Sequence, residues 1–163
     1  MREEMRPEAE LVDLLRSREW TVTTVESCTG GGISARIVDI PGASDVLRMA
    51  FVTYCDEAKT ALAGVSPETL RKHTAVSAET AEEMARGGAA RADADLCLSA
   101  TGIAGPGGTK EFPAGLVYLG CFLKGEVRVE KHLFSGDRNE VREQAAERAI
   151  QMAVDALKAY DRP

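Results

Sequence analysis

The hydrophobic and polar residues of this chain follow two periods, one typical of helices and the other typical of strands. A predicted helix over residues 8–18 places three leucines on one face. Three consecutive glycines then open a second helix, in which Ile33, Ile37 and Val38 fall at helical spacing. Four more segments are predicted to be helical: residues 57–62, the stretch that begins at Ser66-Pro67-Glu68, residues 78–91, and the stretch that begins at Asp137.

The other regular segments carry the β-branched and apolar runs that are typical of strands. They cover residues 20–26, 47–54, 95–101, 115–123 and 126–134. Only Lys124-Gly125 separates the last two, which predicts an antiparallel hairpin. Together these elements predict a single-domain α/β/α sandwich over residues 1–163, with a mixed, mostly parallel sheet that includes this hairpin.

Composition and charge narrow the class of protein. The 163 residues suit one domain, and at 44% hydrophobic the chain can bury a core. Twenty Lys and Arg against 26 Asp and Glu give a net charge of −6, which disfavours nucleic acid because cationic contacts to phosphate dominate that affinity. No window approaches the roughly 20 apolar residues of a membrane span. The charged N-terminus lacks the apolar segment of a signal peptide, so we expect a cytoplasmic protein without a membrane partner.

The cysteines and histidines show no pattern of a metal site. The four cysteines are widely spaced and include no CxxC pair, and the two histidines add no zinc-ligand spacing. We therefore expect free thiols and no metal. A Ser-His-Asp triad is also disfavoured, because His73 lies in a charged helix and His132 in a hairpin strand.

Three segments are rich in residues that a hydrophobic core does not need. They are residues 26–32, 52–59 and 101–108, and each follows a predicted strand. Ligands of open α/β sheets bind at the carboxyl ends of the strands, so the three segments are expected to converge on one pocket.

The first segment joins hydroxyl groups to glycines. Backbone N–H groups at a glycine-rich helix start can bind an oxyanion or a phosphate, which makes Ser27, Thr29, Gly30 and Gly31 candidates for substrate contacts. The alternative is a tight turn in which Ser27 and Thr29 only cap the helix. Neither the dinucleotide-binding GxGxxG pattern nor the lysine of a P-loop is present.

The second and third segments supply a base and a second loop. Lys59 can serve as a base if burial lowers its pKa, and Tyr54 could relay a proton or orient it; the alternative for Lys59 is a solvated helix lysine. Thr101 ends a strand, and the glycine loop after it can fold its N–H groups around an anion. Arg138 and Arg142, one helical turn apart, could hold a phosphate or simply form a surface pair with nearby acids.

Several motifs together resemble the CinA carboxy-terminal domain family. They are E-S-C-T-G-G at 26–31, D-I-P-G-A-S at 39–44, F-V-T-Y at 51–54, E-A-K at 57–59, A-V-S at 75–77, T-G-I-A-G-P-G-G at 101–108 and F-S-G-D-R-x-x-V-R at 134–142. The resemblance runs from about residue 8 to residue 158. In this sequence Cys55-Asp56 stands where Ser-Asn is more usual, and the stretch at 109–112 looks slightly shortened.

The resemblance implies an amidohydrolase that converts nicotinamide mononucleotide (NMN) to nicotinate mononucleotide and ammonia in pyridine-nucleotide salvage, without cofactor or metal. It implies that Ser27 is the nucleophile, that Lys59 is its base with Tyr54 close by, and that Thr101, Gly102 and Gly105 line the pocket. Cys28 is the competing nucleophile and is expected to be buried. The phosphate would contact a glycine loop or Arg138 and Arg142.

Two matters stay open at this point. The rival interpretation is a non-catalytic nucleotide-binding module, or an interaction module related to competence or DNA damage, and an assay for ammonia release from NMN discriminates between them. The sequence does not determine the oligomeric state, and a homo-oligomer is one option.

Overall fold

A computed structural model describes residues 5–160 of the chain. Residues 1–4 of the charged N-terminal stretch and residues 161–163 of the predicted domain lie outside this range. The elements are α1 Pro7–Arg18, β1 Val22–Glu26, α2 Gly32–Val38, η1 Ala43–Asp45, β2 Phe51–Val52, α3 Asp56–Ala63, α4 Pro67–His73, α5 Ala78–Ala92, β3 Leu96–Gly102, β4 Leu116–Leu123, β5 Glu126–Leu133 and α6 Arg138–Tyr160. Within the described range, no helix combines the length and the apolar character that crossing a membrane requires.

The five strands form one mixed sheet in the order β2-β1-β3-β4-β5. β1 is parallel to both β2 and β3, whereas β4 is antiparallel to both β3 and β5. Four strands therefore share one direction and only β4 runs the opposite way. Glu26 at the end of β1 pairs with Val52 on one side and Ala100 on the other, so three carboxyl ends meet at one edge of the sheet.

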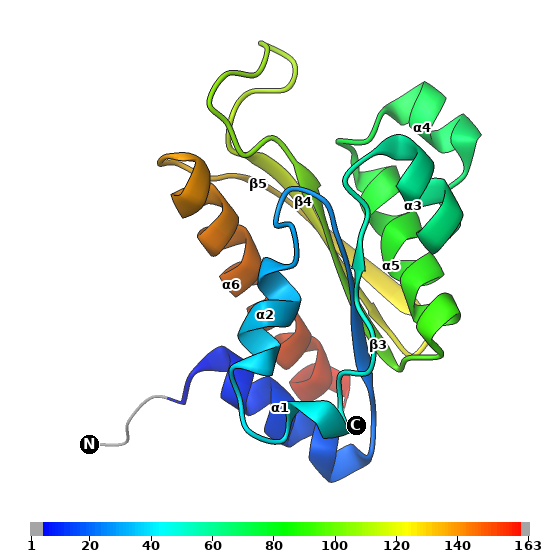
Figure 1. Cartoon of the computed structure of the whole chain (residues 1–163), viewed down its shortest axis with the longest axis vertical. Helices are drawn as coiled ribbons and strands as arrows, with labels where there is room; N and C mark the ends of the chain where they lie inside the picture. Colours follow the sequence, from blue (N-terminus) through cyan, green and yellow to red (C-terminus); the bar gives the residue numbers. More distant parts are fainter. Residues whose placement is uncertain (1–4, 161–163) are drawn as a thin grey trace.

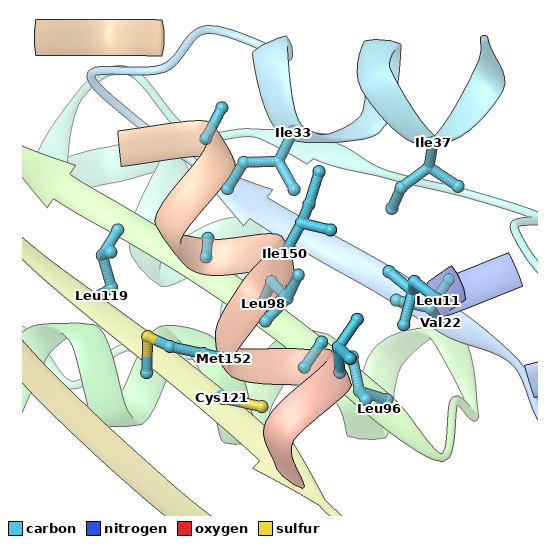
Figure 2. Close-up of a cluster of buried hydrophobic side chains, with 14 of the residues drawn as sticks. Leu11, Val22, Ile33, Ile37, Leu96, Leu98, Leu119, Cys121, Ile150 and Met152 are labelled. Atoms are coloured by element: carbon cyan, nitrogen blue, oxygen red, sulfur yellow. The ribbon is translucent and has the colours of Figure 1, made fainter. Parts of the chain in front are cut away.

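Helices cover both faces of this sheet, which confirms the predicted sandwich (Figure 1). α1, α2 and α6 pack on one face, and α3, α4 and α5 lie on the other. The larger core fills the space under the first group and includes Ile33 and Ile37 of α2, Leu98 of β3 and Ile150 of α6 (Figure 2). The hairpin of β4 and β5 is also as predicted.

Two details differ from the sequence prediction. Val38 is 63% exposed, because the buried face of the short α2 runs through Ile33 and Ile37, and Val38 lies about 100° around the helix from Ile37. The strand predicted over 47–54 shrinks to Phe51–Val52 and a single bridge at Leu47. Between them, the carbonyl of Met49 accepts a hydrogen bond from the Thr23 hydroxyl, 2.8 Å away, which takes the place of a ladder contact.

Close contact between α5 and the sheet depends on glycine. A Cβ atom on Gly88 would lie 2.3 Å from Val25 Cγ2 and 2.9 Å from Cys97 Sγ. Neighbouring Gly87 lies against the backbone carbonyl of Ala63 in α3. The small residues of α5 therefore set the depth at which α3 and α5 sit on the sheet.

The Gly88→Ala substitution should destabilise the protein by about 1–3 kcal/mol, because the added methyl overpacks this contact. Helix propensity alone predicts the opposite sign, since alanine is favoured over glycine by about 1 kcal/mol in a helix interior. Denaturant unfolding measures the difference, with Ala90→Gly on the exposed side of α5 reporting the propensity contribution. A Gly88→Ala protein as stable as the unmodified protein would contradict the packing described above.

Candidate active site

A cavity of about 330 Å³ lies at the edge where β1, β2 and β3 end. Its lining includes most of the predicted site residues: Ser27, Tyr54, Lys59, Thr101, Gly102, Gly105 and Arg138. The three segments that were expected to converge on one pocket do so. The residues of the first segment divide, however, because Ser27 and Cys28 line this cavity whereas Thr29 and Arg142 line a separate, smaller one.

Ser27 and Lys59 meet inside the cavity. Lys59 Nζ lies 3.0 Å from Ser27 Oγ and 2.7 Å from the backbone carbonyl oxygen of Thr53. Lys59 is only 2% exposed, although it belongs to the first turns of an outer helix. Its long side chain reaches inward from α3 to the end of β1, so the solvated-lysine alternative is excluded.

Burial governs the acid–base character of this amine. Desolvation lowers the pKa of Lys59 below its ordinary value, and the nearby charge of Asp56 partly opposes that shift. Neither hydrogen-bond partner of the amine is a carboxylate. A neutral amine is suited to these two partners, because its lone pair can accept the Ser27 hydroxyl proton while an N–H donates to the Thr53 carbonyl.

The turn that carries Ser27 is held from within by a buried carboxylate. Glu26 is fully buried, and its Oε1 accepts a hydrogen bond from Ile33 N at 2.8 Å while Oε2 accepts one from Ser34 N at 3.1 Å. The Thr24 hydroxyl donates a third hydrogen bond to Oε2. The first turn of α2 therefore has its own internal anion, which is incompatible with the expectation that this helix start binds a substrate oxyanion.

Thr29, Gly30 and Gly31 have other roles than those predicted. Thr29 is not the helix cap: its buried Oγ1 has no hydrogen-bond partner among residues 5–160, and Glu26 accepts hydrogen bonds from the helix N–H groups instead. Gly30 and Gly31 have φ angles of +59° and +99°, a backbone conformation that side-chain-bearing residues rarely adopt. Neither glycine lines the Ser27 cavity, so they serve the sharp turn rather than the approach of substrate.

The two arginines of α6 point to different partners. Arg142 Nε donates to the carbonyl of Cys28 at 3.1 Å, and its Nη2 donates to the carbonyl of Thr29 at 3.0 Å. Arg138 Nη1 donates to the carbonyl of Gly105 at 2.6 Å, and its Nη2 donates to the hydroxyl of Tyr54 at 3.0 Å. Arg142 holds the two carbonyl groups of the turn after Ser27, whereas Arg138 binds Tyr54 and Gly105. The two guanidinium groups therefore do not share a phosphate site, and these hydrogen bonds are not the predicted surface pairs with nearby acids.

Tyr54 and Thr101 line the cavity, and their hydroxyl groups form hydrogen bonds to other residues than Lys59. The Tyr54 side chain is 60% exposed and its hydroxyl accepts from Arg138, so it lies at the rim and offers no direct proton relay to Lys59. Thr101 is buried at the end of β3, and its hydroxyl donates to the carbonyl of Ala75 at 2.7 Å. That bond fixes the chain ahead of α5 against the cavity wall.

The other reactive side chains are poorly placed for chemistry here. Cys28 is buried, as predicted, and burial raises the pKa of its thiol to about 11, which disfavours a thiolate nucleophile. His132 pairs with Glu130, and His73 lies near Glu79, both away from the cavity lining. Among residues 5–160 there is no cluster of three or more potential metal ligands.

Sequence reasoning missed the role of Glu26 and the position of Asp56 in the cavity lining. An acid at the end of the otherwise β-branched and buried run V-T-T-V-E was a usable signal, since a buried carboxylate requires nearby hydrogen-bond donors. The bracing by Arg142 spans 113 and 114 residues along the chain and leaves no local signal.

Comparison with known proteins agrees with this fold and with the motifs. A CinA-like protein of Kosmotoga olearia is 49% identical over 148 residues, and one of Dictyoglomus thermophilum is 47% identical over 133 residues. These matches cover 90% and 81% of this chain but 36% and 32% of the relatives, so the chain spans about a third of their length.

Solved structures match over nearly their whole length. The competence damage-inducible protein A of Klebsiella pneumoniae has a TM-score of 0.92 at 33% identity, covering 95% of this chain and 97% of that one. The competence/damage inducible protein CihA of Agrobacterium tumefaciens has a TM-score of 0.86 at 36% identity, covering 97% and 99%. Residues 4–157 match the CinA C-terminal domain, and the chain therefore belongs to that family.

Proposed function

We propose that this chain is an amidohydrolase that uses Ser27 as nucleophile and Lys59 as base to hydrolyse the carboxamide of NMN. The observation that carries the proposal is the buried amine of Lys59, 3.0 Å from Ser27 Oγ in a cavity at the carboxyl edge of the sheet. A serine hydroxyl is a weak nucleophile and needs a base within hydrogen-bond reach. Lys59 meets this requirement in both distance and lowered pKa.

The reaction proceeds in two steps that reuse the same lysine. Ser27 Oγ attacks the carboxamide carbon while Lys59 Nζ accepts the hydroxyl proton, and the lysine then passes that proton to the departing ammonia. Water next attacks the resulting Ser27 ester while Lys59 Nζ accepts a proton from it. The bond between Ser27 Oγ and the carbonyl carbon then breaks, Lys59 returns the proton to Ser27 Oγ, and nicotinate mononucleotide leaves. The cationic pyridinium ring makes the carbonyl more electrophilic, and its charge in the cavity further disfavours protonation of Lys59.

The negative charge that develops on the carbonyl oxygen needs hydrogen-bond donors. Gly30 N–H is not available, because it donates to the carbonyl of Ser27 at 3.0 Å. Neither Cys28 N–H nor Thr29 N–H donates to a carbonyl in the described part of the chain. We assign the oxyanion contact to Cys28 N–H, the peptide next to the nucleophile, since Cys28 lines the cavity and Thr29 does not.

The substrate phosphate is assigned to the rim of the cavity. Arg138 lies there between Tyr54 and the glycine loop at Gly105, and its guanidinium is exposed to solvent. Arginine suits this task because its planar donors match phosphate oxygens. Thr101, Gly102 and Gly105 form the wall between the rim and Ser27.

The Ser27→Ala variant should lose ammonia release from NMN by at least about 10³-fold, because the nucleophile is gone while the fold persists. A coupled assay for ammonia measures turnover, and circular dichroism checks the fold. Ser44→Ala, a substitution of an exposed serine outside the cavity, should leave the rate unchanged. Saturable NMN binding without ammonia release by the unmodified protein would favour a binding module over an enzyme, and near-normal turnover in Ser27→Ala would rule out the covalent route.

A neutral Lys59 also predicts a pH-dependent stability that does not involve substrate. The unfolded lysine titrates near 10.5 and burial lowers the folded pKa, so between the two values the unfolded chain holds a proton that the folded chain does not. The contribution of Lys59 to the free energy of unfolding should therefore rise as the pH approaches 10.5 from below, by up to about 1.4 kcal/mol per pH unit. Lys59→Met removes this titration and serves as the reference.

Urea unfolding of both proteins between neutral pH and pH 10 measures the effect. The stability of the unmodified protein should increase relative to that of Lys59→Met across this range. A difference that stays constant over the same range would mean that Lys59 remains protonated in the fold.

A further inference from the structure

The described residues that line the Ser27 cavity include one acidic and two basic side chains, and the proposed mechanism uses only the two basic ones. Lys59 supplies the base and Arg138 lies at the rim. The third is Asp56, the first residue of α3. Tyr54 and Cys28 are the other titratable groups in the lining. Once Lys59 is neutral, the cavity carries one negative group and one positive group.

We propose that Asp56 is a specificity-determining residue that selects substrates with a positive charge next to the reacting carboxamide. This inference rests on the proposed function for the identity of the nucleotide. It goes further in stating which feature of the nucleotide the cavity recognises and which residue recognises it.

The position of Asp56 places its charge beside the reacting group. Asp56 precedes Lys59 by three residues on α3, a spacing that brings side chains onto one face of a helix. Lys59 in turn lies 3.0 Å from Ser27 Oγ, where the carboxamide carbon must sit for attack. A pyridinium ring bonded to that carboxamide therefore lies within the field of the Asp56 carboxylate.

The two charges of the cavity match the two charges of the substrate. A pyridine mononucleotide carries a cationic ring at one end and an anionic phosphate at the other. Arg138, bound to Tyr54 and Gly105, comes from the α6 side of the cavity, whereas Asp56 comes from α3. Opposite charges at separate positions fix the direction in which such a ligand enters, with its carboxamide toward Ser27.

The same carboxylate favours departure of the product. Hydrolysis replaces a neutral carboxamide by a carboxylate, which adds a negative charge at the end of the ligand that lies near Asp56. Repulsion between the two carboxylates weakens binding of the product relative to the substrate.

The charge of Asp56 that selects the substrate also acts on Lys59. The charge of Asp56 opposes the effect of burial and raises the pKa of Lys59, which disfavours the neutral amine in the empty site. A bound cation offsets this influence by pairing with Asp56. The residue therefore links recognition of a cationic ring to activation of the lysine.

The test compares two ligands that differ in the charge of the ring. NMN and its reduced dihydropyridine form share the carboxamide, ribose and phosphate, but the reduced ring is neutral. Dissociation constants are measured by calorimetry in the Ser27→Ala background, with and without Asp56→Asn, so that no turnover occurs. Because Asp56 is exposed and screened by solvent, we expect a modest change, with NMN binding about threefold to tenfold more weakly in Asp56→Asn.

Binding of the reduced nucleotide should change less than twofold in the same variant. The difference for NMN should shrink at about 1 M salt, where the screening length falls to about 3 Å. Glu57→Gln is the matched control, since Glu57 is an exposed acid next to Asp56 that does not line the Ser27 cavity, and it should leave both dissociation constants unchanged.

An equal loss of affinity for both nucleotides in Asp56→Asn, or no loss for either, would overturn the inference, as would the absence of saturable NMN binding. These outcomes are separate from those of the proposed function. A chain that releases no ammonia from NMN but loses affinity for NMN alone on Asp56→Asn substitution would refute the amidase and retain the selectivity. With active enzyme, Asp56→Asn should also move the acidic limb of the kcat/KM profile to lower pH, since the substitution lowers the pKa of Lys59.

Discussion

The central constraint on this structure is a buried amine whose hydrogen-bond partners do not include a carboxylate. Lys59 is nearly inaccessible to solvent, and among the described residues its amine forms hydrogen bonds to a serine hydroxyl and a backbone carbonyl. Burying a charge under these conditions is expensive, and this cost lowers the pKa of the amine. The lowered pKa of Lys59 is thus a consequence of the packing of α3 on the sheet, and it is the property that a general base requires.

The rest of the site keeps the serine in reach of that amine. Glu26 ties the end of β1 to the first turn of α2 from the inside, and Arg142 holds the carbonyls of the same turn from α6. Gly30 and Gly31 allow the chain to reverse between these two anchors because both occupy the left-handed region. Side chains on rigid elements, rather than a mobile loop, therefore set the distance between nucleophile and base.

Much of this arrangement could be predicted from the sequence, because strand ends in an α/β sheet meet at one edge. Ser27, Lys59 and the loop after Thr101 were expected to share a pocket, and the lining confirms that they do. The roles of Thr29 and Arg142 were not predictable in the same way. Arg142 binds carbonyl groups that are 113 and 114 residues away along the chain, and Glu26 rather than Thr29 accepts the N–H groups at the start of α2.

The short β2 shows the same limit on the scale of the fold. Its residues have the composition of a longer strand, yet the Thr23 hydroxyl donates to the Met49 carbonyl between the Leu47 bridge and Phe51, which interrupts the ladder. Propensity describes which segments can be strands, and tertiary hydrogen bonds decide how much of each segment pairs. The position of Asp56 was not predicted for a similar reason. Its charge acts on the cavity only when α3 is packed against the sheet.

The most direct test of this account is titration of the Lys59 side chain by nuclear magnetic resonance. Selective labelling of the lysine side chains, with Lys59→Met to assign the signal, follows protonation of this amine alone. The pKa of this amine should lie below the ordinary lysine value of 10.5, so that Lys59 loses its proton before the solvent-exposed lysines do. A Lys59 signal that titrates together with those lysines would contradict a neutral base in the cavity and the mechanism built on it.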